Sequence, residues 1–306
     1  MQDFHELPKL RDSLSYLYIE HAVLERKDSA ILVLQETGRT MVPAADLCVL
    51  MLGPGTSLTH AAVDLLVEDG CSVIWCGEDS SLFYAQGMGE THKNRHIMHQ
   101  AAMVSDPVKR LEVVLKMYEK RFGYAPTPDL SLDQIRGMEG VRMRNAYADI
   151  SRKTEVPWTG RKYDRKDWVN ADPVNRALSA ANAVLNGICH AGIVSGGYSP
   201  ALGFLHTGWM LSFVYDIADL YKVEFTIPIA FEIVKESPYG VETRARMACR
   251  ERFREGQLLE RILPDIDSLM GIKQDEELPE ELVLPDYWWQ PGEEAERKTS
   301  DGRNNP

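Results

Sequence analysis

The stretch DPVNRALSAANAVLNGICHAGIVSGG, Asp172–Gly197, shows how the larger part of this chain is built. Asp172 followed by Pro173 is typical of a helix start, because aspartate caps free N–H groups and a proline at the first helical position has no N–H to lose. We predict a helix from there to about Val194. The run Ser195-Gly196-Gly197 should end it, since glycine readily adopts the backbone that follows a helix.

The sequence on both sides of this stretch also has a helical pattern. Residues 94–122 carry apolar side chains at helical spacing among charges. After a proline-containing break at residues 124–129, Ser131 and Gln134 have the spacing of a capping box at the start of the next helix. Further helices are predicted at about 212–222, 226–236, 241–255 and 257–270.

Residues 14–86 differ, because short apolar runs alternate there with turns. The predicted strands are interrupted by one helix that Gly70 caps, over Ser57–Asp69. We therefore predict an α+β fold, in which a small β-rich N-terminal domain (1–88) precedes a larger all-helical domain (89–273) and an acidic, flexible tail (274–306). The strands are expected at Leu14–Tyr18, Ala22–Glu25, Ala30–Leu34, Leu47–Leu52, Ser72–Cys76 and Ser81–Ala85.

The composition is that of a folded globular protein, with 306 residues of which 44% are hydrophobic and 26% charged. The sequence has no run of about 18 apolar residues, so we expect no membrane-spanning helix and no membrane partner. The N-terminus has no apolar segment of a secretory signal. The five cysteines follow no disulfide or metal-binding spacing, which predicts buried free thiols and a cytoplasmic location.

The net charge of −12 is unevenly distributed along the chain. Residues 274–306 hold ten acidic and three basic side chains, a net charge of −7, whereas residues 93–166 hold sixteen basic and nine acidic ones, a net charge of +7. A basic middle segment of this size permits nucleic-acid binding, although solvated helices often carry a similar excess.

The densest candidate site lies in residues 203–219, where His206 stands between two glycines on a predicted loop. Asp216 and Asp219 follow three residues apart on a predicted helix and would share one face. Apolar neighbours place both carboxylates at the border of a buried surface, where an unpaired charge is unfavourable, so we expect a cation to compensate them. A solvated helix face remains the alternative for this spacing.

Glu139 is the best candidate for a third ligand. It lies between Gly137 and Gly140 in a predicted helix, and glycines there cost about 1 kcal/mol each against alanine. This pattern predicts close packing against the backbone at that point. Three arginines on neighbouring turns suit phosphate oxygens; they are Arg136, Arg142 and Arg144.

The set Glu139, His206 and Asp219 offers oxygen and nitrogen donors without a thiolate, which favours Mg²⁺ or Mn²⁺ over a structural zinc. Arginines beside such a metal indicate phosphoryl transfer on a nucleic acid. The metal would polarise a phosphate oxygen and activate a hydroxyl nucleophile.

Taken together, these motifs resemble the spacer integrase, or endonuclease, of the CRISPR adaptation module, the first of the CRISPR-associated proteins, in its subtype I-E form. The resemblance covers most of residues 10–270. It rests on Arg136-Gly-Met-Glu139-Gly-Val-Arg142, His206-Thr-Gly208, Leu211–Asp219, Gly53-Pro-Gly-Thr56, Tyr163-Asp-Arg-Lys-Asp-Trp168 and Met247-Ala-Cys-Arg250.

The resemblance implies an N-terminal β domain, a helical catalytic domain and an asymmetric homodimer. Two such dimers would be bridged by a dimer of the small second adaptation protein. The complex would capture double-stranded DNA with single-stranded 3′ ends and join its 3′-hydroxyls to the CRISPR array by transesterification. An acidic tail carrying Tyr287-Trp288-Trp289 is expected to dock on that partner or to close over the DNA end.

By motif match, Glu139, His206 and Asp219 fall on the metal ligands and Asp216 on a neighbouring catalytic carboxylate. The predicted DNA-binding residues are of two kinds: Tyr163, Trp168 and Tyr215 line the groove for the single-stranded end, and Lys222 and Arg246 contact the backbone. The chain departs from the family pattern at three positions, with Trp209 in place of a lysine, His21 in place of an aromatic and Ser57 in place of a basic residue.

Two other functions remain open at this point. The same three ligands would serve a metal-dependent DNA endonuclease or phosphodiesterase, in which water is the nucleophile. A non-catalytic DNA-binding scaffold is the other alternative. His92, His96 and His99 recur on one helical face, but no carboxylate joins them, so we expect a basic surface near DNA or solvent rather than a metal site.

Overall fold

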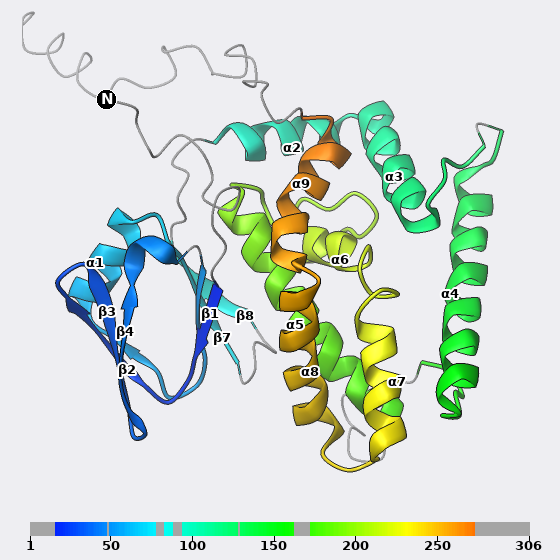
Figure 1. The fold of residues 1–306 in the computed structure, drawn as a ribbon. Coiled ribbons are helices and arrows are strands. Elements are labelled where there is room, and N and C mark those ends of the chain that lie inside the picture. The colour runs from blue at the N-terminus through cyan, green and yellow to red at the C-terminus, as the bar shows by residue number, and fades with distance from the viewer. Residues whose placement is uncertain are drawn as a thin grey trace, which may run out of the picture. The chain divides into compact units, whose positions relative to one another are not determined.

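The computed structural model describes residues 16–47, 49–77, 83–87, 94–127, 129–161 and 172–272, and the rest of the chain is drawn in grey in Figure 1. Tyr163, Trp168, Cys48 and the predicted tail lie outside the described residues. The predicted α+β fold is confirmed: strands occupy the N-terminal part and helices follow (Figure 1). The predicted boundaries after residues 88 and 273 stay predictions.

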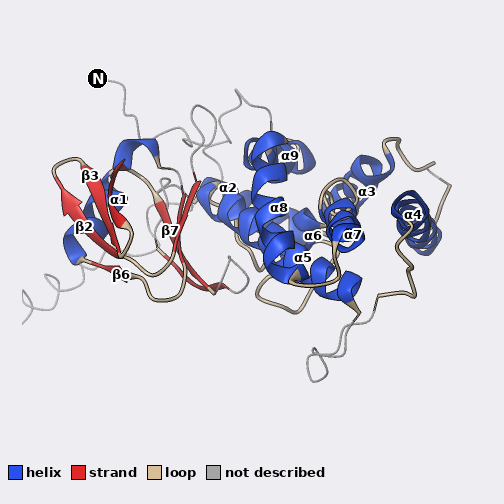
Figure 2. Cartoon of the chain, turned by 60° about the horizontal axis from the view of Figure 1, so that its bottom comes forward, coloured by secondary structure: helices blue, strands red, loops and turns tan. Residues whose placement is uncertain are grey.

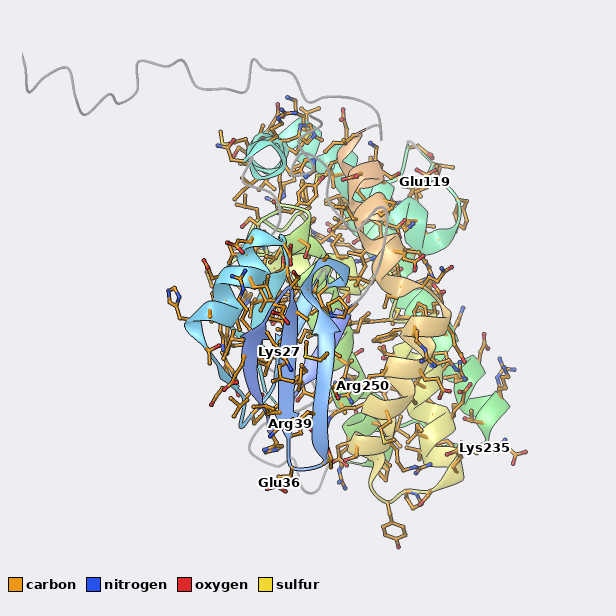
Figure 3. The ribbon with its side chains drawn as sticks, turned by 60° about the vertical axis from the view of Figure 1, so that its left-hand side comes forward. Lys27, Glu36, Arg39, Glu119, Lys235 and Arg250 are labelled. Atoms are coloured by element: carbon orange, nitrogen blue, oxygen red, sulfur yellow. The ribbon has the colours of Figure 1, made fainter. Side chains whose placement is uncertain are left out.

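Among the described residues, the strands form two four-stranded sheets, ordered β1-β5-β7-β8 and β4-β3-β2-β6. The second sheet carries the exposed side chains of Lys27 and Arg39, and the exposed Glu36 lies in the turn between two of its strands (Figure 3). The elements are β1 (Tyr16–Ile19), β2 (Val23–Lys27), β3 (Ala30–Gln35), β4 (Gly38–Pro43), a 3-10 turn (Ala44–Asp46), β5 (Val49–Leu52), β6 (Ser57–Leu58), α1 (His60–Glu68), β7 (Ser72–Cys76) and β8 (Phe83–Gln86).

The predicted strands are all found within a few residues, but two details differ. Residues 38–43 form the additional strand β4, and Ser57–Leu58 form the short strand β6 instead of the first turn of the helix. That helix, α1, begins at His60 and ends as predicted before Gly70, whose φ of +71° suits glycine.

The central strands of the first sheet, β5 and β7, are buried on both faces, which explains why they are continuous apolar runs. Along β5, Leu50 and Leu52 pack into the core of the β-rich part, whereas Val49 and Met51 belong to the larger core that the helices build. Side chains alternate between the two faces of a strand, so one apolar strand connects two cores.

The helical part surrounds α5, with α6, α7, α8 and α9 packed about it (Figure 2). The predicted cap is confirmed, because the Asp172 side chain accepts from Asn175 N at 3.0 Å. The helices are α2 (Arg95–Ser105), α3 (Pro107–Phe122), α4 (Leu132–Thr154), α5 (Pro173–Ser195), α6 (Ser212–Ala218), α7 (Thr226–Glu236), α8 (Val241–Glu255) and α9 (Leu258–Met270).

The helical pattern over 94–122 is confirmed, but it forms two helices, because the chain breaks at Asp106-Pro107 into α2 and α3. Asp106 is extended, and its side chain accepts from Val108 N and Lys109 N at 2.8 and 3.3 Å. Proline cannot supply the N–H that a continuous helix needs there. The break turns α3 so that its far end, at Arg121, reaches the candidate site described below.

Among the described helices, α5 has the length and apolar composition to cross a membrane, but 72% of its apolar window is buried inside the protein. The helices packed around α5 account for that composition. α5 is therefore the central core helix of this fold. The prediction of buried free thiols is confirmed for four of the cysteines, Cys71, Cys76, Cys189 and Cys249.

His190 on α5 makes stability depend on pH. It is 2% exposed, and burial lowers the pKa of its imidazole from 6.5 to about 4. The unfolded chain then binds the proton more readily, so this contribution to stability is complete above about pH 6.5 and is lost as the pH falls toward 4. From pH 7 to 5 we expect the unfolding free energy of the native chain to fall about 2 kcal/mol more than that of His190→Gln. Denaturant titrations at both pH values test this, and equal losses in the two proteins would contradict it.

The histidines of α2 form interhelical contacts, and the predicted basic surface is wrong for two of them. His96 Nδ1 lies 2.5 Å from the carbonyl oxygen of Gly196, and its ring stacks on Tyr198. His99 Nε2 lies 3.0 Å from the carbonyl oxygen of Met270. Both side chains therefore attach α2 to the ends of α5 and α9, while His92 lies outside the described residues.

Candidate active site

The loop between α5 and α6 is folded around the carboxylate of Asp216, which is fully buried. Its Oδ2 accepts from Phe204 N at 2.6 Å and from Leu205 N at 3.1 Å, and its Oδ1 accepts from His206 N at 2.9 Å. Three backbone N–H groups thus converge on one carboxylate. This arrangement fixes the backbone that carries His206.

These contacts correct the expectation that a cation compensates both aspartates. Backbone N–H groups and His206 compensate Asp216, so its burial needs no metal. The predicted shared face fits the structure, because Asp219, the C-terminal cap of α6, keeps helical dihedral angles (φ −62°, ψ −20°) and His206 lies between the two carboxylates, 2.7 Å from Asp216 Oδ1 and 4.0 Å from Asp219 Oδ2. Asp216 points into the loop, whereas the side chain of Asp219 is 22% exposed.

His206 is oriented by Asp216. Its Nδ1 lies 2.7 Å from Asp216 Oδ1, and because an ionised carboxylate only accepts, the ring must donate through Nδ1. In the neutral ring the other nitrogen, Nε2, has a lone pair, and it lies 4.0 Å from Asp219 Oδ2. The hydrogen bond to Asp216 raises the pKa of His206 above its usual value, while burial partly opposes the shift.

Two basic side chains pair with the carboxylate of Asp219. Lys222 Nζ lies 2.5 Å from its Oδ1, and Arg121 Nη2 lies 3.6 Å from its Oδ2. Arg121 also approaches the main chain of α6, where Nη2 donates to the carbonyl oxygen of Asp216 at 3.5 Å. The end of α3 is therefore held against α6 by one arginine.

The same arginine links this cluster to Glu139 on α4, a helix at the edge of the helical part beside α3 and α7 (Figures 1 and 2). Arg121 Nη1 lies 3.8 Å from Glu139 Oε1, and Arg142 on the next turn of α4 approaches the same oxygen at 3.2 Å. The Arg121 side chain is only 5% exposed. Two of the three predicted ligands, Glu139 and Asp219, thus pair with one buried guanidinium, and the third, His206, lies beside Asp219.

The residues present fit a divalent cation such as Mg²⁺ or Mn²⁺ by donor chemistry, with two carboxylates and one imidazole. His206 Nε2 and Asp219 Oδ2 are 4.0 Å apart, a span that one ion with bonds of about 2.1 Å could bridge. Among the described residues, no three acidic, histidine or cysteine side chains already form a closed metal cluster. In the structure, the positive charge between Glu139 and Asp219 comes from the guanidinium of Arg121.

The prediction that another group packs closely against the backbone at the glycines beside Glu139 is wrong. A Cβ on Gly137 would meet nothing within 4 Å, and one on Gly140 only the end of Arg144 at 3.8 Å. Gly137 instead lines an open groove of about 1100 Å³ between α4 and the start of α7, with Val141 and Ile227 among its walls.

Two of the predicted DNA-binding residues lie in the candidate site, and the others do not. Tyr215 joins the site, with its ring edge-on to that of His206 at 6.0 Å between centroids. Lys222 also joins it, but as the ion-pair partner of Asp219. Arg246 is half-buried on α8 and lies near Glu242, whose pKa it helps to lower. Tyr163 and Trp168 lie outside the described residues.

Two arginines that sequence reasoning missed hold the site together. Arg110 donates to the carbonyl oxygen of Phe204 through Nε at 3.0 Å and Nη2 at 2.7 Å. Arg121 continues the buried face of α3 at helical spacing from Val114 and Met117. A charged residue in register with an apolar stripe was the available signal, because burial of an arginine requires partners.

The fold and the site together define an α+β protein whose helical part carries a carboxylate and imidazole cluster around a buried arginine. The family model described as CRISPR associated protein Cas1 matches residues 15–127 and 119–239. The protein named CRISPR-associated endonuclease Cas1 2 from Thermus thermophilus is 51% identical over 309 residues, with 100% of this chain and 95% of that protein covered. The chain therefore belongs to the Cas1 family.

Other relatives agree with this assignment. CRISPR-associated endonuclease Cas1 of Escherichia coli K12 is 39% identical over 263 residues, 86% of each protein. A crystal structure of a TtCas1–DNA complex has 55% identity and a TM-score of 0.73, and covers 86% of this chain and 99% of that chain. A casposase bound to its integration product shares the fold at a TM-score of 0.60 with 14% identity, covering 94% of this chain and 98% of that chain.

Proposed function

We propose that this chain is the metal-dependent DNA integrase of CRISPR adaptation, which joins the 3′-hydroxyl ends of captured short DNA to the CRISPR array by transesterification. The observation that carries the proposal is the convergence of Glu139, His206 and Asp219 from α4, a loop and the end of α6. Arg121 lies 3.8 Å from Glu139 and 3.6 Å from Asp219, and His206 lies 4.0 Å from Asp219. Phosphoryl transfer needs such a concentration of carboxylates beside cations.

Each residue of the site has a defined role in this reaction. Glu139, His206 and Asp219 would hold Mg²⁺ or Mn²⁺, which polarises a phosphate oxygen and activates the attacking hydroxyl when bound. Asp216 keeps His206 in the tautomer that leaves Nε2 free, so it acts as a positioning carboxylate. Lys222 and Arg121 balance the negative charge of Asp219, and Lys222 would also contact a phosphate placed there.

DNA is the substrate of this proposal, and the crystal structure of the TtCas1–DNA complex supports that choice. The substrate would be double-stranded DNA with single-stranded 3′ ends, with CRISPR array DNA as the acceptor. Tyr163, Trp168 and Tyr215 would line the path of the single-stranded end. Lys222 and Arg246 would contact the backbone.

The assembly in which this occurs is also part of the proposal. We infer an asymmetric homodimer, with two such dimers bridged by a dimer of the small second adaptation protein, as in subtype I-E. The reaction would take place in the cytoplasm. The free buried thiols, such as Cys189 and Cys249, are compatible with a reducing compartment.

Hydrolysis of DNA by the same site is the second candidate. The relatives from Thermus thermophilus and Escherichia coli are both named endonucleases, which favours it. The ligands would be unchanged and only the nucleophile would differ, with water replacing a DNA 3′-hydroxyl. A scaffold without catalysis is the third, and it requires no metal at all.

One experiment separates the three candidates. The full chain, with and without the small second adaptation protein, is incubated with Mn²⁺ or Mg²⁺, a short labelled duplex and a supercoiled plasmid that carries a CRISPR array. We expect metal-dependent transfer of the label to the plasmid, with more product when the partner is present. Metal-dependent nicking without label transfer would support hydrolysis, and no product with either metal would support the scaffold.

DNA affinity should depend steeply on salt if the basic segment, 93–166, contacts phosphates. A footprint of about 6–10 phosphates would lose roughly 10³–10⁵ in affinity between 50 and 200 mM salt. Fluorescence anisotropy with a labelled duplex measures this in the absence of metal. Lys235, an exposed lysine outside that segment (Figure 3), provides the matched control, and Lys235→Ala should leave the slope unchanged. A flat response of the native chain would contradict the phosphate contacts.

A further inference from the structure

Two large apolar side chains are exposed beside the candidate site, on the loop that carries His206. Trp209 is 75% exposed and Met210 is 77% exposed. Exposed apolar residues are common singly, but a neighbouring tryptophan and methionine on one loop form a small apolar surface that water does not favour.

The backbone beneath these side chains is tightly held. Buried Ser212 accepts from Trp209 N at 3.1 Å and donates its hydroxyl to the Trp209 carbonyl oxygen at 2.8 Å. Gly203 packs so closely on the loop that a Cβ there would lie 2.3 Å from the His206 carbonyl oxygen. Gly208 has a φ of +88°, which turns the chain outward just before the tryptophan.

A fixed backbone with an exposed indole is suited to binding a flat ligand. Only the side chain of Trp209 loses freedom on binding, because its main chain is already ordered. The indole face also has the size of one nucleobase, and every base offers an aromatic face for stacking. Two side chains are too small for a stable protein interface, which needs about 800 Å² from each partner.

The position of this surface on the chain points to DNA. Trp209 follows His206 by three residues, and the Tyr215 ring stands edge-on to that imidazole. Positive charge is close by, because Lys222 forms an ion pair with Asp219. His206 Nε2 lies 4.0 Å from Oδ2 of the same aspartate. An aromatic face beside cations is the combination that binds single-stranded nucleic acid.

We propose that Trp209, flanked by Met210, is a stacking site for an unpaired base next to the DNA end that the candidate site processes. This inference rests on the proposed function for the identity of the ligand. It adds a contact that depends on an unpaired base and not on phosphate charge. Discrimination between a frayed or overhanging end and a blunt end would follow from it.

The test is a binding comparison without metal, so that it does not depend on catalysis. The full chain is titrated in EDTA with a duplex whose four-nucleotide 3′ overhang carries 2-aminopurine, and with a blunt duplex of equal length. Trp209→Ala is compared with Trp209→Phe, which keeps an aromatic face. Tyr239→Ala is the matched control, because Tyr239 is 82% exposed in the turn between α7 and α8.

We expect Trp209→Ala to lose roughly five- to a hundredfold in affinity for the duplex with the overhang, which is the usual contribution of one base stacked on an aromatic side chain. Its affinity for the blunt duplex should change little. Quenching of 2-aminopurine should fall in Trp209→Ala and persist in Trp209→Phe, with Tyr239→Ala equal to the native chain. Equal losses for both duplexes, unchanged quenching, or a changed oligomeric state of Trp209→Ala would overturn the proposal. Absence of strand transfer by the native chain would count against the proposed function alone.

Discussion

Replacement of any one of Glu139, His206 or Asp219 should abolish DNA strand transfer, with at least about a hundredfold loss. The three side chains come from different elements and share no role in the core, and Glu139 and Asp219 remain 16% and 22% exposed. Each contributes one donor to the proposed cation. The reaction therefore loses its metal, not its fold, when one donor is removed.

Glu139→Gln, His206→Ala and Asp219→Asn are the variants of choice, because the two amides keep the shape of the carboxylates. Ligands that act on one cation behave as a unit, so double variants should be no slower than single ones. Metal-free DNA affinity should stay within about threefold of the native chain, since the lost groups contact the proposed metal and not most of the phosphates.

Glu119→Gln is a matched control, because Glu119 is an exposed carboxylate on α3 two residues before Arg121 (Figure 3). It should integrate at the native rate. Transfer that persists above a few per cent in one of the three site variants would remove that residue from the ligand set. Loss of the circular dichroism signal of the fold in a variant would instead assign that side chain a structural role.

Asp216→Ala should destabilise the protein by about 3–5 kcal/mol, far more than any change at Asp219. The mutation leaves the N–H groups of Phe204, Leu205 and His206 without their acceptor, and a buried N–H that loses its partner costs roughly 1–3 kcal/mol. Asp219 is partly exposed, and its partners are the side chains of Lys222 and Arg121, the second of which keeps Glu139 when Asp219 is replaced. Its replacement by alanine should change stability by less than about 1 kcal/mol.

Urea unfolding followed by circular dichroism measures both changes. Asp216→Asn is the milder variant for the case in which Asp216→Ala does not fold. Its amide oxygen can accept from two of the three N–H groups, so we expect an intermediate loss of about 1–3 kcal/mol. Equal stability of Asp216→Ala and Asp219→Ala would show that the loop is held by other contacts.

Capping signals predicted the helices best, because they depend on a few residues close in sequence. Asp172-Pro173 and the Ser131–Gln134 capping box both mark real helix starts. The same Asp-Pro signal at Asp106-Pro107 was present and overlooked, since the apolar spacing continued through it. The helix break was thus predictable from sequence. It was missed because the helical spacing of apolar residues continues across Asp106-Pro107.

Strand β4 could not be found from its pattern. Its residues Gly38–Pro43 are almost entirely exposed at the edge of a sheet, so they show no apolar alternation. The pairing of β1 with β5 and of β5 with β7 is likewise invisible in sequence, because a parallel register depends on contacts between distant segments.

The candidate site was predictable in its members and not in its connections. Motif spacing singled out His206, Asp216 and Asp219, but it assigned both aspartates the same kind of partner. The structure separates them, since Asp216 binds the loop backbone and Asp219 binds Lys222 and Arg121. Arg121 is 18 residues from Glu139 and 98 from Asp219, so only the folded chain relates the three.

The most direct test of integration at this site uses the 3′ end of the donor DNA. A radiolabelled duplex ending in 3′-hydroxyl and an otherwise identical one ending in 3′-dideoxy are each incubated with the full chain, its small partner, Mn²⁺ and an array plasmid. The proposed transesterification predicts label joined to the plasmid from the hydroxyl duplex, none from the dideoxy duplex, and none from either with Asp219→Asn. Plasmid cleavage that is equal with both duplexes, without joined label, would contradict integration and assign the site to hydrolysis.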